Sequence, residues 1–168
     1  MPPPITEFVD VNVVLAGAAA EKFSFGTLLG AFDHSVTANR VDGPYSSVDE
    51  VNAAGFTSAA EPEVNAWATA VFAQDDGVDK LLIGRQDAGD ASWTVTLDAI
   101  EAEAGVGAFY VLNVETRTEA DILLAAAWVE ARRMILIAQS SDAAILTGAA
   151  GNVFEDLQTA GYHRTAGI

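Results

Sequence analysis

Apolar and polar residues alternate at the start of the chain, before longer apolar blocks take over. In the segment FVDVNVVL, residues 8–15, every second residue from Val9 is apolar, and Asp10, Asn12 and Val14 lie between them. A two-residue period is typical of a β-strand with one buried face. Its apolar side consists of Val9, Val11, Val13 and Leu15. Because prolines at positions 2–4 favour an extended backbone, we predict an extended N-terminal arm over residues 1–20.

Short apolar blocks of the kind that form strands recur along the remaining chain. We expect strands at 23–32, 81–83, 93–96, 109–114, 134–138 and 162–168. The blocks at 81–83 and 134–138 are apolar throughout, as is typical of strands covered on both faces. Together with 110–114, they are expected to be neighbours in one sheet.

Helical patterns separate these strands. Ser47 and Glu50, and again Asn152 and Glu155, have the spacing of a capping box, in which each side chain satisfies a free backbone donor of the first turn. Pro62 suits the first turn of a longer helix. The apolar face of that helix is expected to comprise Val64, Trp67, Ala68, Val71 and Phe72. Further helices are predicted at 97–104 and 118–131.

The alternation of strands and helices predicts an α/β fold, in which a layered domain has a mostly parallel sheet flanked by helices. A chain of 168 residues is long enough for one such core. We assign the α/β domain to residues 21–168, following the arm. The loop at 86–91 is a candidate subdomain boundary within it.

Composition restricts the function. The chain has 24 acidic residues against eight Lys and Arg, a formal charge of −16, and such a chain repels nucleic-acid phosphates. It contains no cysteine, which excludes disulfides and thiolate chemistry. No apolar run of about 18 residues is present to span a membrane, and the N-terminus lacks a signal-peptide pattern. We expect a soluble protein that binds neither nucleic acid nor membrane.

Residues of catalytic type do not form a recognisable constellation. Asp33, His34 and Ser35 are adjacent in sequence, whereas a catalytic relay needs side chains that converge in space. We therefore interpret them as a polar turn after a strand. The only other histidine, His163, gives no metal-ligand spacing with His34. We expect no catalytic residues, no metal and no cofactor.

Acidic loop residues resemble fragments of a calcium-binding loop without its complete register. They are Asp75, Asp76, Asp79, Asp87 and Asp90. We interpret them as solvated loop acids.

A glycine-containing loop at 147–151 precedes the helix expected at Asn152 and is the best candidate for an anion site, because a helix start offers free backbone donors. It lacks the lysine of a P-loop. It nevertheless leaves an alternative function open: a small α/β domain that binds a nucleotide or another anionic small molecule. Trp67 and Trp128 are expected to be core residues rather than ligand platforms.

Several segments, in this order and spacing, resemble the contractile tail sheath family of phages. They are VDVNVVL at 9–15, FGTLLGAFDH at 25–34, YSSVDEV at 45–51, WATAVFAQDDG at 67–77 leading into LLIGR at 81–85, and GYHRTA at 161–166. Their succession, rather than any one motif, carries the resemblance.

The resemblance implies a mechanical function and no catalytic residues. Sheath subunits polymerise around an inner tail tube and contract to drive it through the host envelope, and their terminal arms exchange strands with neighbours. The implied partners are other copies of the chain, the tube protein, and baseplate and neck proteins. The implied location is the virion tail, after assembly in the host cytoplasm. Because sheath proteins are usually longer, with a C-terminal domain and a second arm, the chain resembles the N-terminal portion of one. It is either a fragment of such a protein or a subunit that lacks the remainder.

Overall fold

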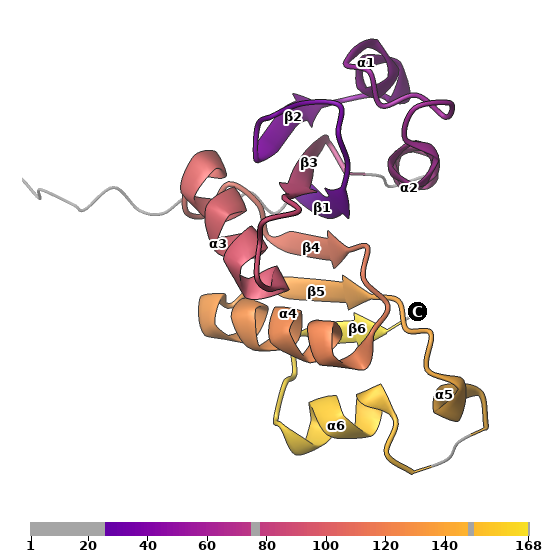
Figure 1. Cartoon of the computed structure of the whole chain (residues 1–168), viewed down its shortest axis with the longest axis vertical. Helices are drawn as coiled ribbons and strands as arrows, with labels where there is room; N and C mark the ends of the chain where they lie inside the picture. The colour runs from indigo at the N-terminus through magenta and orange to yellow at the C-terminus, as the bar shows by residue number, and fades with distance from the viewer. Residues whose placement is uncertain (1–25, 75–77, 148–149, 168) are drawn as a thin grey trace, which may run out of the picture.

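A computed structural model describes residues 26–74, 78–147 and 150–167 of the chain (Figure 1). The predicted arm, with Val9, Val11, Val13 and Leu15, lies outside the described residues, as do Asp75 and Asp76.

Six strands form one sheet, in the order β2-β3-β1-β4-β5-β6. Their bounds are β1 Thr27–Asp33, β2 Val41–Tyr45, β3 Lys80–Gln86, β4 Val111–Val114, β5 Ile135–Ala138 and β6 Thr165–Gly167. Only β2 is antiparallel to its neighbour. The five parallel strands have the order of a flavodoxin-like, doubly wound sheet. The predicted α/β fold with a mostly parallel sheet is therefore confirmed.

Helices cover the sheet on both faces. Their bounds are α1 Val48–Ala53, α2 Pro62–Phe72, α3 Trp93–Ala104, α4 Glu119–Arg132, α5 Ala143–Thr147 and α6 Val153–Thr159. Side chains from α1 and α2 form one hydrophobic cluster with the sheet, and those from α3, α4 and α6 form the other. In the described part of the chain, none of these helices combines the length and hydrophobicity needed to cross a bilayer.

The two helix starts predicted from capping pairs are confirmed, with one difference in the capping bonds. The Ser47 hydroxyl accepts a hydrogen bond from the Glu50 N–H at 3.3 Å, as in a capping box. The Glu50 carboxylate, however, accepts from the N–H of Ser46, one residue before the cap, at 2.7 Å. Asn152 and Glu155 make the corresponding pair of bonds at the start of α6. The side chains therefore fix the chain entering each helix as well as its first turn.

The strand predicted at 93–96 is wrong, because these residues form the first turn of α3. Ser92 caps this helix by accepting a bond from the N–H of Val95. Trp93, Leu97 and Ile100 are all buried at helical spacing. The strand propensity of the Thr and Val residues here is overridden by the cap and by burial of one helix face.

The predicted order of strands in the sheet is also partly wrong. The segment at 110–114 does pair with 134–138 through β4 and β5. The segment at 81–83, however, lies two strands from β4, because β1 is inserted between them. The crossover through α3 carries the chain past β1, a step that local apolar patterns do not encode. The helix α5 was also not predicted.

One glycine allows α2 to approach the sheet closely. A Cβ atom on Gly30, in the middle of β1, would lie 2.3 Å from Cη2 of Trp67 on α2 and 2.6 Å from Cε2 of Phe32. The rings of Trp67 and Phe32 pack edge to face at 5.1 Å. The absence of a side chain at this position therefore lets two aromatic rings close over β1.

Candidate functional site

The carboxyl ends of the parallel strands meet at one edge of the sheet. The crossover that follows β1 packs α1 and α2 on one face, whereas the crossover that follows β4 packs α4 on the other. The crevice between β1 and β4 is therefore the topological switch point, which is the usual binding position in open α/β sheets. This crevice is the candidate functional site.

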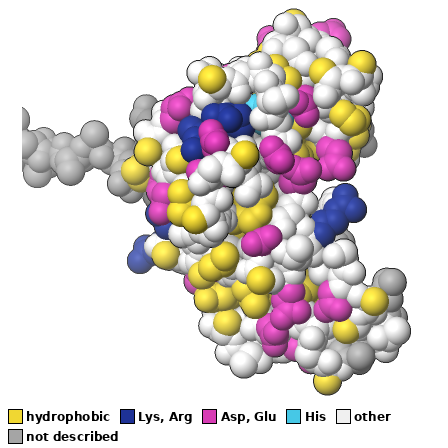
Figure 2. All heavy atoms as spheres, viewed as in Figure 1, with side chains coloured by type: hydrophobic (Ala, Val, Ile, Leu, Met, Phe, Trp, Pro, Cys, Tyr) yellow, Lys and Arg dark blue, Asp and Glu magenta, His cyan; other side chains and the backbone are white. Residues whose placement is uncertain are grey.

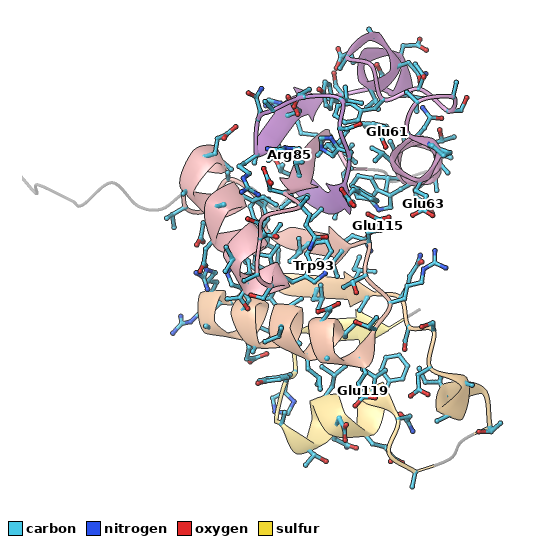
Figure 3. The ribbon with its side chains drawn as sticks, viewed as in Figure 1. Glu61, Glu63, Arg85, Trp93, Glu115 and Glu119 are labelled. Carbon is cyan, nitrogen blue, oxygen red and sulfur yellow. The ribbon has the colours of Figure 1, made fainter. Side chains whose placement is uncertain are left out.

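Acidic side chains from three elements converge at this crevice. Glu115, just after β4, accepts a 2.7 Å hydrogen bond from the N–H of Asp33 at the end of β1. The carboxyl of Glu63, on α2, lies against that of Glu115 (Figure 3). Glu61 accepts a bond from the N–H of Ser35 at 3.1 Å. Burial and the Glu63 carboxyl raise the pKa of Glu115, whereas the Asp33 bond opposes this rise.

A groove of about 330 Å³ opens beside these carboxyls, between α2 and the sheet. Its apolar wall is formed mainly by Phe32 and Trp67. The groove is also lined by Ala66, Ala70, Asn113, Val114, Gln139, Glu63, Glu115 and Arg117. With two carboxyls and one guanidinium, this groove suits an apolar or cationic group better than a phosphate.

A second carboxyl pair lies along the same edge. A hydrogen bond to Asp156 of α6 and burial raise the pKa of Glu119, at the start of α4, with Asp142 adding a smaller repulsion. Figure 2 shows acidic side chains gathered near α2 and again between α4 and α6. The carboxyl edge is thus strongly acidic at two places.

Protein groups already use the backbone donors at the start of α6, where the anion site was expected. The N–H of Gly151 donates to the Glu155 carboxylate at 2.6 Å, and the N–H of Val153 donates to Asp142 at 3.3 Å. The Asn152 side chain accepts from the next two N–H groups. Residues 148–149 lie outside the described residues. The N–H groups of Gly151, Val153, Phe154 and Glu155 are therefore bound to side-chain oxygens, two of which belong to carboxylates.

The segment Asp33, His34 and Ser35 follows β1 directly, but its side chains do not converge. Asp33 and Ser35 are exposed, whereas His34 is only 5% exposed and packs edge to face on Phe56 at 4.9 Å. Neither ring nitrogen of His34 has a hydrogen-bond partner among the described residues. This arrangement agrees with a turn after a strand and offers no nucleophile–base pair at these three positions.

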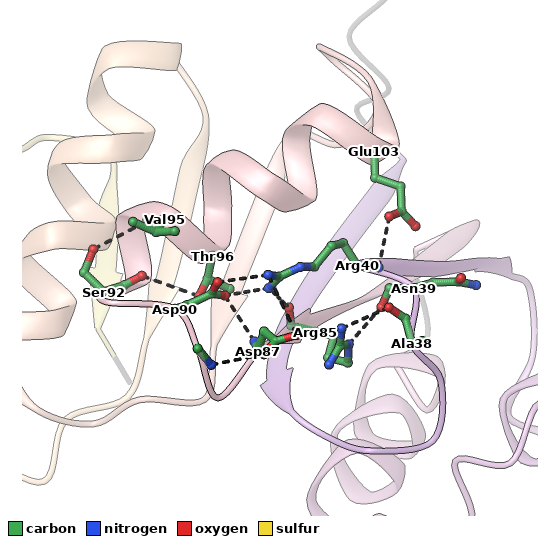
Figure 4. Close-up of polar contacts among 11 residues, drawn as sticks. Ala38, Asn39, Arg40, Arg85, Asp87, Asp90, Ser92, Val95, Thr96 and Glu103 are labelled. Carbon is green, nitrogen blue, oxygen red and sulfur yellow. Dashed lines mark hydrogen bonds and ion pairs between the residues drawn. The ribbon is translucent and has the colours of Figure 1, made fainter.

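Asp90 is held by arginine rather than by solvent, so the interpretation of it as a solvated acid is wrong. Both carboxylate oxygens accept from the Arg40 guanidinium, at 2.5 and 2.9 Å, and Thr96 donates a third bond at 2.8 Å (Figure 4). The Asp90 side chain is 6% exposed. The Arg40 bond is the largest cause that lowers its pKa to about 2.

The same network holds the loop at 86–91 against the chain that enters β2. Asp87 pairs with Arg85 at 3.0 Å, and Arg85 donates to the carbonyl oxygens of Ala38 and Asn39. Within the described residues, no group of three or more His, Asp or Glu side chains is placed to hold a metal ion. Asp87 and Asp90 therefore act as arginine counter-ions, while Asp79 is exposed.

Sequence reasoning missed the carboxyl cluster at the switch point. Asp33 and Glu115 are 82 residues apart, and no motif joins them. The available signal was that each lies at or just after the end of a predicted strand. Since parallel strands end at one sheet edge, such positions converge whatever their spacing.

Comparison with protein-family models and with curated proteins found no match to this chain. The resemblance to tail sheaths therefore rests on the sequence segments alone. Beyond these segments, the fold and the geometry of the carboxyl edge are the features of the structure that bear on function.

We expect Asp90→Asn to lower the free energy of unfolding by about 1–2 kcal/mol at pH 7, because the variant loses a charge-assisted pair that is largely removed from water. The pKa of Asp90 is lowered in the folded state, so the difference from wild type should be full above pH 3.8 and vanish as the pH falls through about 2. Urea unfolding at several pH values measures it. Asp87→Asn, at a side chain that is 40% exposed, is the control and should change stability much less, because water screens its ion pairs. Equal effects of the two variants would contradict this role of Asp90.

We expect Glu115→Gln to stabilise the protein at pH 8. The raised pKa of Glu115 means that its favourable, protonated state is lost as the pH rises, whereas glutamine retains a neutral group. The gain should disappear near pH 4. Because Glu63→Gln relieves the same repulsion, the two substitutions should be non-additive, with a coupling of about 0.5 kcal/mol or more.

Asp49→Asn, an exposed position on α1, controls for the loss of one negative charge. The experiment compares the urea unfolding midpoints of the two single variants, the double variant and this control. Additive effects of Glu63→Gln and Glu115→Gln would show that the two carboxyls do not interact.

Proposed function

We propose that this chain is a structural subunit of a contractile phage tail sheath, which polymerises around an inner tail tube and contracts to drive it through the host envelope. The segments that resemble the sheath family include two strands of the sheet and parts of one helical layer. They correspond to β1, the start of α1, the second half of α2 with β3, and the approach to β6. The resemblance therefore covers elements that define the fold rather than scattered loops.

The observation that carries the proposal is a half-face of the sheet without a covering helix. On the face where α1 and α2 cover β1 and β3, the described residues place no helix over β5 and β6 (Figure 1). Ile135 and Ile137 lie there and are half-buried, whereas Val111 of β4, the partner of Ile135 in the sheet, packs against the α1–α2 cluster. Parallel strands normally have both faces covered. In an assembled sheath, contact with neighbouring copies would remove this apolar surface from water.

The two sheet edges differ in how well they can accept another strand. At one edge, β2 contains Pro44, which has no backbone N–H to donate. At the other edge, β6 pairs only with β5 within the described residues, and Ala166 and Gly167 are exposed. An edge of this kind favours addition of a strand from another chain. We therefore propose that the arm strand at 9–15 of one copy adds to the β6 edge of a neighbour.

The proposal also names partners and location. Other copies of the chain, the inner tube protein, and the baseplate and neck proteins would be its partners in the virion tail, after assembly in the host cytoplasm. The alternative, binding of a nucleotide or another anionic molecule, has weaker support. Carboxyl groups line the groove at the switch point, and the N–H groups of Gly151 and Val153 at the start of α6 already bind carboxylates.

Purified protein imaged by negative-stain electron microscopy should show tubes or stacked rings, because sheath subunits assemble with themselves. The protein should be imaged over a series of concentrations that begins well below the concentration at which it scatters light. Exclusively monomeric particles at all concentrations, together with saturable stabilisation by a nucleotide in a melting assay, would favour the alternative function.

Deletion of residues 1–15 should abolish or strongly weaken polymerisation while leaving the melting temperature of the monomer nearly unchanged, because the hydrophobic clusters lie within the α/β domain. The paired substitution Val11→Asp with Val13→Asp should have the same effect by placing charge on the apolar side of the arm. Asn12→Asp, on the opposite side, is the matched control. Normal tubes from the deletion variant, or loss of its folded core, would contradict the role of the arm.

A further inference from the structure

His34 is buried in an unusual state. Its side chain is 5% exposed, and both ring nitrogens lack a hydrogen-bond partner among the described residues. A neutral imidazole has one N–H donor and one acceptor nitrogen. Leaving both unsatisfied away from water costs free energy. Such a residue needs a physical explanation.

The ring lies where β1 leaves the sheet and meets the connection between α1 and α2. It packs edge to face on Phe56, which is fully buried, and Phe56 packs in turn on Tyr45 at 6.3 Å. Phe56 belongs to the cluster that holds α1 and α2 against the sheet. His34 therefore contacts a fully buried side chain of the α1–α2 cluster.

Charged groups face the ring from four elements. Among these groups, the Glu61 carboxylate, just before α2, has the largest effect on the pKa of His34. Asp42 of β2, Arg85 of β3 and Asp33 at the end of β1 follow in that order. The three carboxylates favour a charged imidazole and the guanidinium opposes it. None of these groups is hydrogen-bonded to the ring. A proton on His34 would therefore be a charge inside an apolar cluster without a direct partner, unless the ring or the layer moved.

We propose that His34 is an acid-sensitive latch of the α1–α2 layer: its protonation releases α1 and α2 from the sheet while the layer of α3, α4 and α6 stays in place. The two layers are able to separate because the sheet lies between their hydrophobic clusters. The α1–α2 cluster is the smaller one, and its helices contribute only three buried apolar side chains: Val51, Val64 and Ala68. A charged ring gains water or a carboxylate partner only by leaving its apolar surroundings, which include the ring of Phe56.

The direction of the pH effect follows from linkage. Burial, as the largest cause, lowers the pKa of His34 from its ordinary value of 6.5. The released layer therefore binds the proton more tightly than the closed one, and release becomes more favourable as the pH falls below 6.5. Glu115 acts in the opposite direction, because its raised pKa lets protonation strengthen the contact with Glu63 of α2. The experiment is therefore carried out in the Glu115→Gln background.

Amide hydrogen exchange of the full chain, compared with His34→Phe at several pH values between 7.5 and 5, tests the latch. After correction for intrinsic exchange, the opening constant of amides at 48–56 and 62–72 should increase by up to about tenfold per pH unit below 6.5, since one proton is taken up. His34→Phe should remove this dependence. Amides of α3 and α4 should show none of it. His163→Phe, at the exposed second histidine, is the matched control and should behave as the parent.

A direct titration keeps the test independent of whether the Phe variant folds. The chain has two histidines, so the ring protons are resolved by NMR and assigned with His163→Phe. The His34 midpoint should lie below 6.5. A midpoint at or above 6.5, an unchanged pH dependence in His34→Phe, or simultaneous opening of α3 and α4 would each overturn the proposal.

Discussion

The fold depends on the alternation of side chains along β1, the central strand. Leu28 and Phe32 enter the cluster with α1 and α2, whereas Leu29 and Ala31 enter the cluster with α3, α4 and α6. Because successive residues point to opposite faces, a shift of one residue would exchange the two sets. Gly30, between them, leaves the space that Trp67 occupies. One strand thus fixes the position of both helical layers.

The position of β1 also determines where polar groups gather. It pairs with β3 on one side and β4 on the other, so the crevice at its carboxyl end collects residues from distant parts of the chain. On the β3 side, carboxylates meet Arg40 and Arg85, and the resulting pairs stabilise a loop. On the β4 side, Glu115 meets other carboxyls and its pKa is raised. Acidic side chains therefore stabilise the folded state on the β3 side of β1, where arginines pair with them, and destabilise it on the β4 side, where carboxyls face one another.

Local patterns in the sequence were sufficient to predict the elements whose causes are local. The capping pairs at Ser47 and Asn152 and the apolar face of α2 gave their helices correctly, and the alternation of elements gave the α/β class. The prediction failed at 93–96, where a cap and one buried helix face outweigh strand propensity. It also failed for the insertion of β1 between β3 and β4, because strand order depends on crossovers. The carboxyl cluster was missed for the same reason, since it exists only once that order is known.

The two helical layers are unequal in a way that bears on function. The layer of α3, α4 and α6 covers its face of the sheet with a cluster that extends from β3 to β5, whereas the cluster with α1 and α2 extends from β3 only as far as Val111 of β4. A subunit of a contractile assembly needs one rigid body and surfaces whose contacts can change. The larger cluster can supply the rigid body, while the open half-face beside α2 and the β6 edge can supply the changing contacts. The unequal layers therefore favour a mechanical role over ligand binding in an enclosed pocket.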